Sequence, residues 1–212
     1  AFNAHGQLCV GIDPHEHLLA EWGLDASAAG VREFGLRVVE ACAGHVGIVK
    51  PQVSFFERYG SAGFAALEEV MAAARAADLL VIADAKRGDI GTTMDAYARA
   101  WLTPGSPLEA DALTVSPYLG VGSLTDTFAF ALEHGKGVFV LAATSNPEGA
   151  ALQRAVPKGA ASIARAVADE VSAWNLATTG EGLGNVGLVV GATIDRYASG
   201  LPEALTPSAP LL

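Results

Sequence analysis

Six short apolar runs, rich in Val, Ile and Leu, recur along this chain of 212 residues. Each run is nearly continuous rather than alternating with polar residues, which is typical of a strand buried on both faces of a sheet. The predicted strands are Leu8–Asp13, Val46–Pro51, Leu79–Lys86, Ala112–Pro117, Gly137–Thr144 and Val186–Thr193. Helical spacing between them predicts helices over Ala26–Ala43, Phe55–Ala77, Thr93–Leu102, Leu124–His134 and Ala160–Asn175. Strands that alternate with helices must run parallel, because each helix returns the chain to the edge where the next strand begins.

Two architectures fit this repeat, a doubly wound open sheet and a closed (β/α)₈ TIM barrel. Nearly every predicted strand ends in a charged or hydroxyl residue, and a barrel mouth gathers such ends better than a single crevice does. We therefore predict an α/β fold of the TIM-barrel class, as a single domain over residues 1–212. A barrel needs eight strands and commonly about 250 residues, and Ala209–Leu212 looks like the opening of a seventh strand. We expect the C-terminal part of the barrel to lie outside this sequence.

The composition argues against two kinds of partner. With 13 Lys and Arg against 23 Asp and Glu, the formal charge is −10, whereas a nucleic-acid groove needs clustered basic residues. The apolar runs are far shorter than the roughly 18 residues of a membrane helix. We predict that the protein binds no nucleic acid and no membrane. Its two cysteines, Cys9 and Cys42, lack C-x-x-C spacing, which indicates core thiols in a reducing cytoplasm.

The strongest chemical signal follows the third predicted strand, in the segment Ala83–Thr93. Residues i and i+2 of an extended strand point to one face, so Asp84 and Lys86 are predicted to project into the same space. A structural ion pair is one interpretation. Buried opposite charges are costly and are weak evidence of a stabilising role, so a functional site is the favoured one.

Two further charged residues end neighbouring strands. Lys50 ends the second predicted strand and Asp13 ends the first. Adjacent strands lie about 4.8 Å apart, so Lys50 can meet the Asp84 and Lys86 side chains. The sequence thus predicts an alternating array of ammonium and carboxylate groups at the strand ends.

Five segments together resemble the orotidine 5′-phosphate decarboxylase family, in the bacterial branch with the longer barrel. They are Gly11–Pro14, Val49–Pro51, Asp84–Thr93, Ser116–Tyr118 and Ala143–Gly149. The similarity runs in order over nearly the whole chain. The D-x-K-x-x-D motif by itself is less specific, because related sugar-phosphate decarboxylases and synthases share it.

The resemblance implies decarboxylation of orotidine 5′-monophosphate to UMP, the last step of de novo pyrimidine nucleotide synthesis, without a metal or organic cofactor. Lys86 resembles the catalytic lysine, the acid that protonates the carbanion left at carbon six of the pyrimidine. Asp84 resembles the aspartate beside the substrate carboxylate. Lys50 and Asp89 complete a Lys-Asp-Lys-Asp array.

The resemblance also implies how the nucleotide is held. Asp13 and Lys50 match ligands of the ribose hydroxyls, and Ser145 matches a serine that hydrogen-bonds the pyrimidine ring. A homodimer is implied because the family completes each site with residues of the neighbouring subunit, which here correspond to Asp89, Ile90 and Thr93. The family's phosphate grip, a P-G-[VI]-G-x-Q loop and a later arginine, is not in this sequence, so its ligands are expected beyond Leu212.

Several alternatives stay open. Asp89 could cap the helix that follows it, Ser145 could cap a turn before Pro147, and His15 and His17 could bind a metal, although a solvated turn is favoured there. A Mg²⁺-dependent sugar-phosphate decarboxylase or synthase on the same scaffold is the main alternative function. A Schiff-base aldolase and a barrel without turnover are the others.

Overall fold

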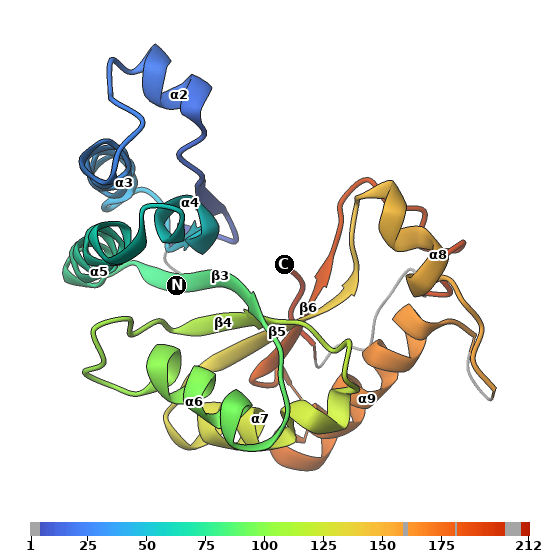
Figure 1. Cartoon of the computed structure of the whole chain (residues 1–212). Coiled ribbons are helices and arrows are strands. Elements are labelled where there is room, and N and C mark those ends of the chain that lie inside the picture. The colour runs from blue at the N-terminus through green and yellow to red at the C-terminus, as the bar shows by residue number, and fades with distance from the viewer. Residues whose placement is uncertain (1–4, 159–160, 181, 202–208) are drawn as a thin grey trace. The chain divides into compact units, whose positions relative to one another are not determined.

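The computed structural model describes residues 5–158, 161–180, 182–201 and 209–212 (Figure 1). Its strands follow one another in the hydrogen-bonded order β1-β2-β3-β4-β5-β6. Pairing is parallel between β1 and β2, between β2 and β3, and between β5 and β6. The strands are β1 (Cys9–Ile12), β2 (Ile48–Pro51), β3 (Leu80–Arg87), β4 (Ala112–Val115), β5 (Gly137–Ala143) and β6 (Val186–Val190). The predicted α/β class with a parallel sheet is confirmed.

Helices lie between successive strands, as the repeated pattern predicted. The α-helices are α2 (Glu16–Glu21), α3 (Ala28–Cys42), α4 (Val53–Glu57), α5 (Gly60–Ala76), α6 (Gly91–Leu102), α7 (Thr125–Glu133), α8 (Ala150–Gln153) and α9 (Ile163–Thr179). Two short 3₁₀ helices, η1 (Val121–Leu124) and η2 (Pro147–Gly149), precede α7 and α8. The chain forms two compact units, one of Ala1–Ala85 with Arg99–Leu113 and one of Lys86–Ala98 with Thr114–Leu212.

The first unit has its core between the strands β1 to β3 and the helices α3 and α5. These two helices pack against each other, and α3 also contacts β1 and β2 (Figure 1). The helices approach so closely that a Cβ atom at Gly35 would lie 2.6 Å from Val70 Cγ2. Val70 is fully buried, so this glycine permits the crossing of α3 and α5.

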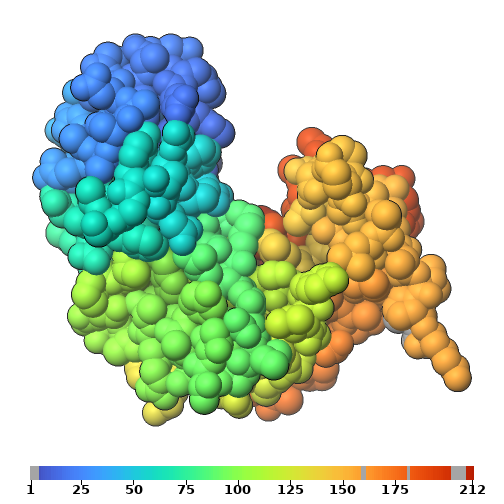
Figure 2. All heavy atoms as spheres, in the orientation of Figure 1, coloured from blue at the N-terminus to red at the C-terminus, as the bar shows by residue number. Residues whose placement is uncertain are grey.

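The second unit has its core between β5 and β6 and the helices α7 and α9. Phe128 of α7 meets Trp174 of α9 edge to face, with ring centroids 5.6 Å apart. Asn175 is fully buried, and both ends of its amide are satisfied. Its nitrogen donates to Val186 O at 2.7 Å and its oxygen accepts from Val186 N at 3.2 Å, at the start of β6. The segment after α8 projects from this unit, where Val156 is exposed (Figure 2).

Several helix boundaries differ from the predictions, and two of these differences have a clear physical cause. The prediction of a single helix over Phe55–Ala77 is wrong. The helix is interrupted between α4 and α5, where Gly60 adopts a φ of +61°. The last predicted helix begins later than expected, at Ile163, because the Ser162 side chain caps it by accepting from Arg165 N at 2.9 Å. Its predicted first residue, Ala160, lies outside the described residues.

The last described residues run parallel to β6. Leu188 N donates to Pro210 O and Leu212 N donates to Leu188 O, both at 2.9 Å. Val190 N donates to Leu212 O at 3.0 Å. Residues 210–212 therefore bond to the edge of β6 in the manner of a neighbouring strand.

Candidate functional site

An ion pair joins the carboxyl end of β2 to the middle of β3 in the first unit. Lys50 Nζ lies 3.0 Å from Asp84 Oδ2, and 22% and 9% of these side chains are exposed. Parallel pairing places Lys50 opposite Gly11 of β1. The three strands thus bring a cation and a carboxylate together at one edge, as the sequence predicted for these two residues.

Gln52 lies next to the Lys50–Asp84 pair and bonds to the main chain of β1 and β3. Its Nε2 donates to the main-chain oxygen of Asp84 at 3.2 Å, and its N–H donates to Ile12 O at 3.1 Å. A parallel bridge also pairs Gln52 with Asp84. Gln52 therefore ties β1, β2 and β3 together, a role that the sequence did not predict.

Asp13 directly follows β1, and Cys9 is the first residue of that strand. A Cβ at Gly11 would lie 2.3 Å from Asp13 Oδ2, so the Asp13 carboxylate folds back over this glycine. The pKa of the Cys9 thiol is raised, first by burial and then by the Asp84 and Asp13 carboxylates, while Lys50 opposes the shift. Lys50, Asp84 and Asp13 thus act electrostatically on one thiol, whereas the sequence predicted only a core residue at this position.

Lys86 lies where the chain enters the second unit. Its side chain is exposed, and its backbone has a φ of +49°, outside the extended region. The Lys86 N–H donates to the hydroxyl of Thr114 in β4 at 3.0 Å. The alternation assumed for Asp84 and Lys86 requires an extended backbone, so that premise is wrong at Lys86, although β3 continues to Arg87.

The predicted subunit-bridging residues lie in the turn between β3 and α6 and in the first turn of α6. Asp89 is half-buried and its Oδ1 accepts the N–H of Ile90 at 2.8 Å. Ile90 is 61% exposed, and Thr93 is also exposed. A Cβ at Gly88 would approach Ser116 O to 2.8 Å, so the turn packs tightly on the chain after β4.

Ser145 lies in an ordered loop after β5. The neighbouring Thr144 is held by Gln153 of α8, whose Oε1 accepts Thr144 N at 2.9 Å and whose Nε2 donates to Thr144 Oγ1 at 2.7 Å. Ser145 itself is exposed. The N-cap position of η2 is Asn146, so the alternative in which Ser145 caps this turn is wrong.

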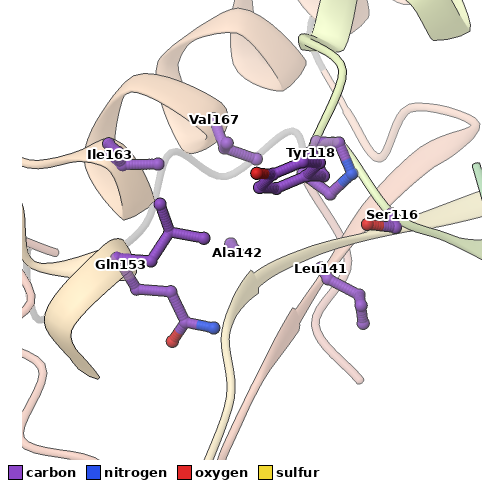
Figure 3. A pocket seen from close by; sticks show the side chains of 9 residues that line it. Ser116, Tyr118, Leu141, Ala142, Gln153, Ile163 and Val167 are labelled. Atoms are coloured by element: carbon purple, nitrogen blue, oxygen red, sulfur yellow. The ribbon is translucent and has the colours of Figure 1, made fainter. Parts of the chain in front are cut away.

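A pocket of about 200 Å³ lies beside this loop in the second unit (Figure 3). Its floor is Ala142 of β5, and the Tyr118 ring closes one side of it. Gln153 links the pocket wall to Thr144 through the two hydrogen bonds given above. The full lining is Ser116, Pro117, Tyr118, Leu141, Ala142, Leu152, Gln153, Ile163 and Val167.

Among the described residues, no group of three or more His, Cys, Asp and Glu side chains is placed to hold a metal ion. His15 instead precedes α2 and packs edge to face on Phe55, with ring centroids 4.4 Å apart. No helix in the described ranges has the length and apolarity needed to cross a membrane.

Comparisons with known proteins agree on one family. A family model described as "Orotidine 5′-phosphate decarboxylase / HUMPS family" matches residues 6–207. Orotidine 5′-phosphate decarboxylase of Salinispora arenicola is 57% identical over 202 residues, which cover 95% of this chain and 72% of that protein. The enzyme of the same name from Corynebacterium efficiens is 55% identical over 195 residues, covering 92% and 70%.

Solved structures give the same result. A crystal structure from Streptomyces avermitilis that carries the same enzyme name aligns with a TM-score of 0.93 and 51% identity, over 99% of this chain and 72% of that one. The structure of Leishmania donovani OMP decarboxylase aligns with a TM-score of 0.71 and 38% identity, over 90% of this chain and 66% of that one.

Proposed function

Because this chain belongs to the orotidine 5′-phosphate decarboxylase / HUMPS family, we propose that it decarboxylates orotidine 5′-monophosphate to UMP in the cytoplasm. The observation that carries the proposal is the Lys50–Asp84 pair at 3.0 Å, at the start of the Asp84-x-Lys86-x-x-Asp89 segment. The parallel sheet and the likeness to the Streptomyces structure support the (β/α)₈ barrel class as the scaffold.

The reaction needs charge and a proton rather than a covalent partner. The bond between carbon six of the pyrimidine and the carboxylate carbon breaks, carbon dioxide leaves, and the electron pair stays on carbon six. No neighbouring group of the ring accepts this pair, so stabilisation must come from fixed charges. The Lys86 ammonium supplies the positive charge and then the proton, which forms the new C–H bond of UMP.

The other charged residues position the substrate and Lys86. Asp84 lies beside the substrate carboxylate. Lys50 contacts Asp84 directly and so keeps the Asp84 carboxylate paired with a positive charge. Asp13 and Lys50 bind the ribose hydroxyls. Ser145 hydrogen-bonds the pyrimidine ring, which is supported by its exposure in a loop that Gln153 holds in place.

We further propose that the active form is a homodimer. Asp89, Ile90 and Thr93 complete the site of the partner subunit, with Asp89 as the second carboxylate of the charge array. The exposure of Ile90 and Thr93 supports this role, since an isolated subunit leaves both side chains to solvent.

The proposed function is tested by following the loss of substrate absorbance with excess chelator present. We expect turnover in the chelator, and we expect Lys86→Ala to lose nearly all of it while substrate-analogue binding stays within about tenfold, because the ammonium acts mainly in the transition state. The control is Lys158→Ala, which removes an exposed lysine after α8 and should retain full activity. Turnover that appears only after Mg²⁺ is added would instead support a sugar-phosphate decarboxylase or synthase.

A further inference from the structure

The backbone at Lys86 is strained, and one buried hydroxyl contacts it. A residue with a side chain rarely adopts a φ of +49°, because its Cβ crowds the main chain there. Such strain persists only where the surrounding structure enforces it. Strained residues are concentrated at functional sites, so the contacts that hold Lys86 are candidates for a role in the reaction.

Thr114 supplies the contact. It is the one polar residue in the sequence Ala-Leu-Thr-Val of β4, and it is fully buried. Its hydroxyl accepts the Lys86 N–H at 3.0 Å. In a regular parallel ladder this N–H would donate to a main-chain carbonyl, so a side chain here takes the place of a backbone acceptor.

The residues that follow Lys86 are held by the segment that follows Thr114. Ser116 N donates to Arg87 O at 2.7 Å, and Gly88 fits against the Ser116 carbonyl, where a Cβ would come within 2.8 Å. Two main-chain groups in succession are therefore fastened, the N–H of Lys86 and the carbonyl of Arg87. Thr114 takes part through its side-chain hydroxyl, which a substitution can remove.

We propose that Thr114 is a positioning residue, whose hydroxyl holds Lys86 in the left-handed conformation and so aims the ammonium at carbon six of the substrate. The proposal rests on the proposed decarboxylase function. A hydroxyl acceptor is required at this position, and bulk alone is insufficient. Serine can therefore replace threonine, and valine, which has the same shape without the acceptor, cannot.

The test compares Thr114→Val and Thr114→Ser in the enzyme expressed from its full reading frame. We expect valine to lower kcat by about ten- to a hundredfold, because a small misplacement of a reacting group costs this much. KM should change less than about threefold, since the substrate's other contacts remain. Serine should restore most of kcat. The matched control is Thr127→Val, which removes another buried threonine hydroxyl in α7 and should leave both constants unchanged.

Amide hydrogen exchange on the wild-type protein gives a readout that needs no substrate. The Lys86 N–H should exchange slowly, and Thr114→Val should accelerate its exchange selectively. Fast exchange in the wild type overturns the proposal even if the valine variant does not fold. Unchanged kcat in a folded Thr114→Val enzyme also overturns it. A wild type that shows slow exchange at Lys86 but does not turn over orotidine 5′-monophosphate would count against the proposed function alone.

Discussion

Lys86 combines an exposed side chain with a left-handed backbone in the last part of a strand. Elsewhere in β3 the residues Val81 to Ala83 are buried and belong to the core. The strand thus serves two purposes, since its first residues stabilise the sheet and its last ones present charged groups. This division predicts that stability and activity respond differently to changes at position 86.

The left-handed conformation can be tested by comparing two variants at this position. Glycine adopts a φ of +49° without a Cβ clash, so Lys86→Gly should be more stable than Lys86→Ala by about 1 kcal/mol in urea unfolding. In an ordinary strand position the order is reversed. Leu80→Gly and Leu80→Ala, at the exposed start of β3, provide that control. Equal stability of the two Lys86 variants, or a more stable alanine variant, would show that position 86 is not strained.

The charges around Cys9 predict how its reactivity depends on pH. Asp84 raises the pKa of this thiol, so Asp84→Asn should lower that pKa and speed alkylation by iodoacetamide at a fixed pH of about 8. Lys50 lowers the pKa, so Lys50→Met should slow the reaction. The measurement uses a Cys42→Ala background, because Cys42 is also a free thiol. Alkylation rates that stay the same in both variants would show that Asp84 and Lys50 do not act on the Cys9 thiol.

At the scale of helices and strands, most of the pattern was predictable because buried parallel strands leave continuous apolar runs in the sequence. The sequence placed Lys50 and Asp84 at neighbouring strand ends, and the structure joins them. It could not identify Gln52, because a glutamine after a strand has no distinctive pattern and its role depends on pairing with Asp84. The left-handed backbone at Lys86 was also unpredictable, since lysine carries no preference for that region.

The crossing of α3 and α5 yields a prediction at the same scale. Gly35→Ala should lower the free energy of unfolding by about 1–3 kcal/mol, because the new methyl would overlap the stiff, buried Val70 side chain. In the double variant with Val70→Ala, the penalty of the glycine change should largely disappear, which a double-mutant cycle measures. Additive effects of the two substitutions would place the strain somewhere other than this contact.

At the scale of the whole molecule, the proposed homodimer has to form between two acidic chains. The formal charge of −10 gives two copies a mutual repulsion, so a specific contact must outweigh it. The exposed Ile90 offers apolar area in the turn that also carries Asp89. Association through this turn would bury Ile90 and bring Asp89 to the partner.

Subunit mixing tests whether Asp89 works in the partner's site. Lys86→Ala and Asp89→Ala proteins should each be inactive, and mixing them should restore activity. A heterodimer then holds one site with both defects and one with neither. Random exchange makes about half of the dimers mixed, so about a quarter of all sites should be intact. If Asp89 acts only within its own subunit, where its Oδ1 accepts the Ile90 N–H, every site carries one defect. A mixture that stays inactive after subunit exchange has been verified would therefore exclude the shared site.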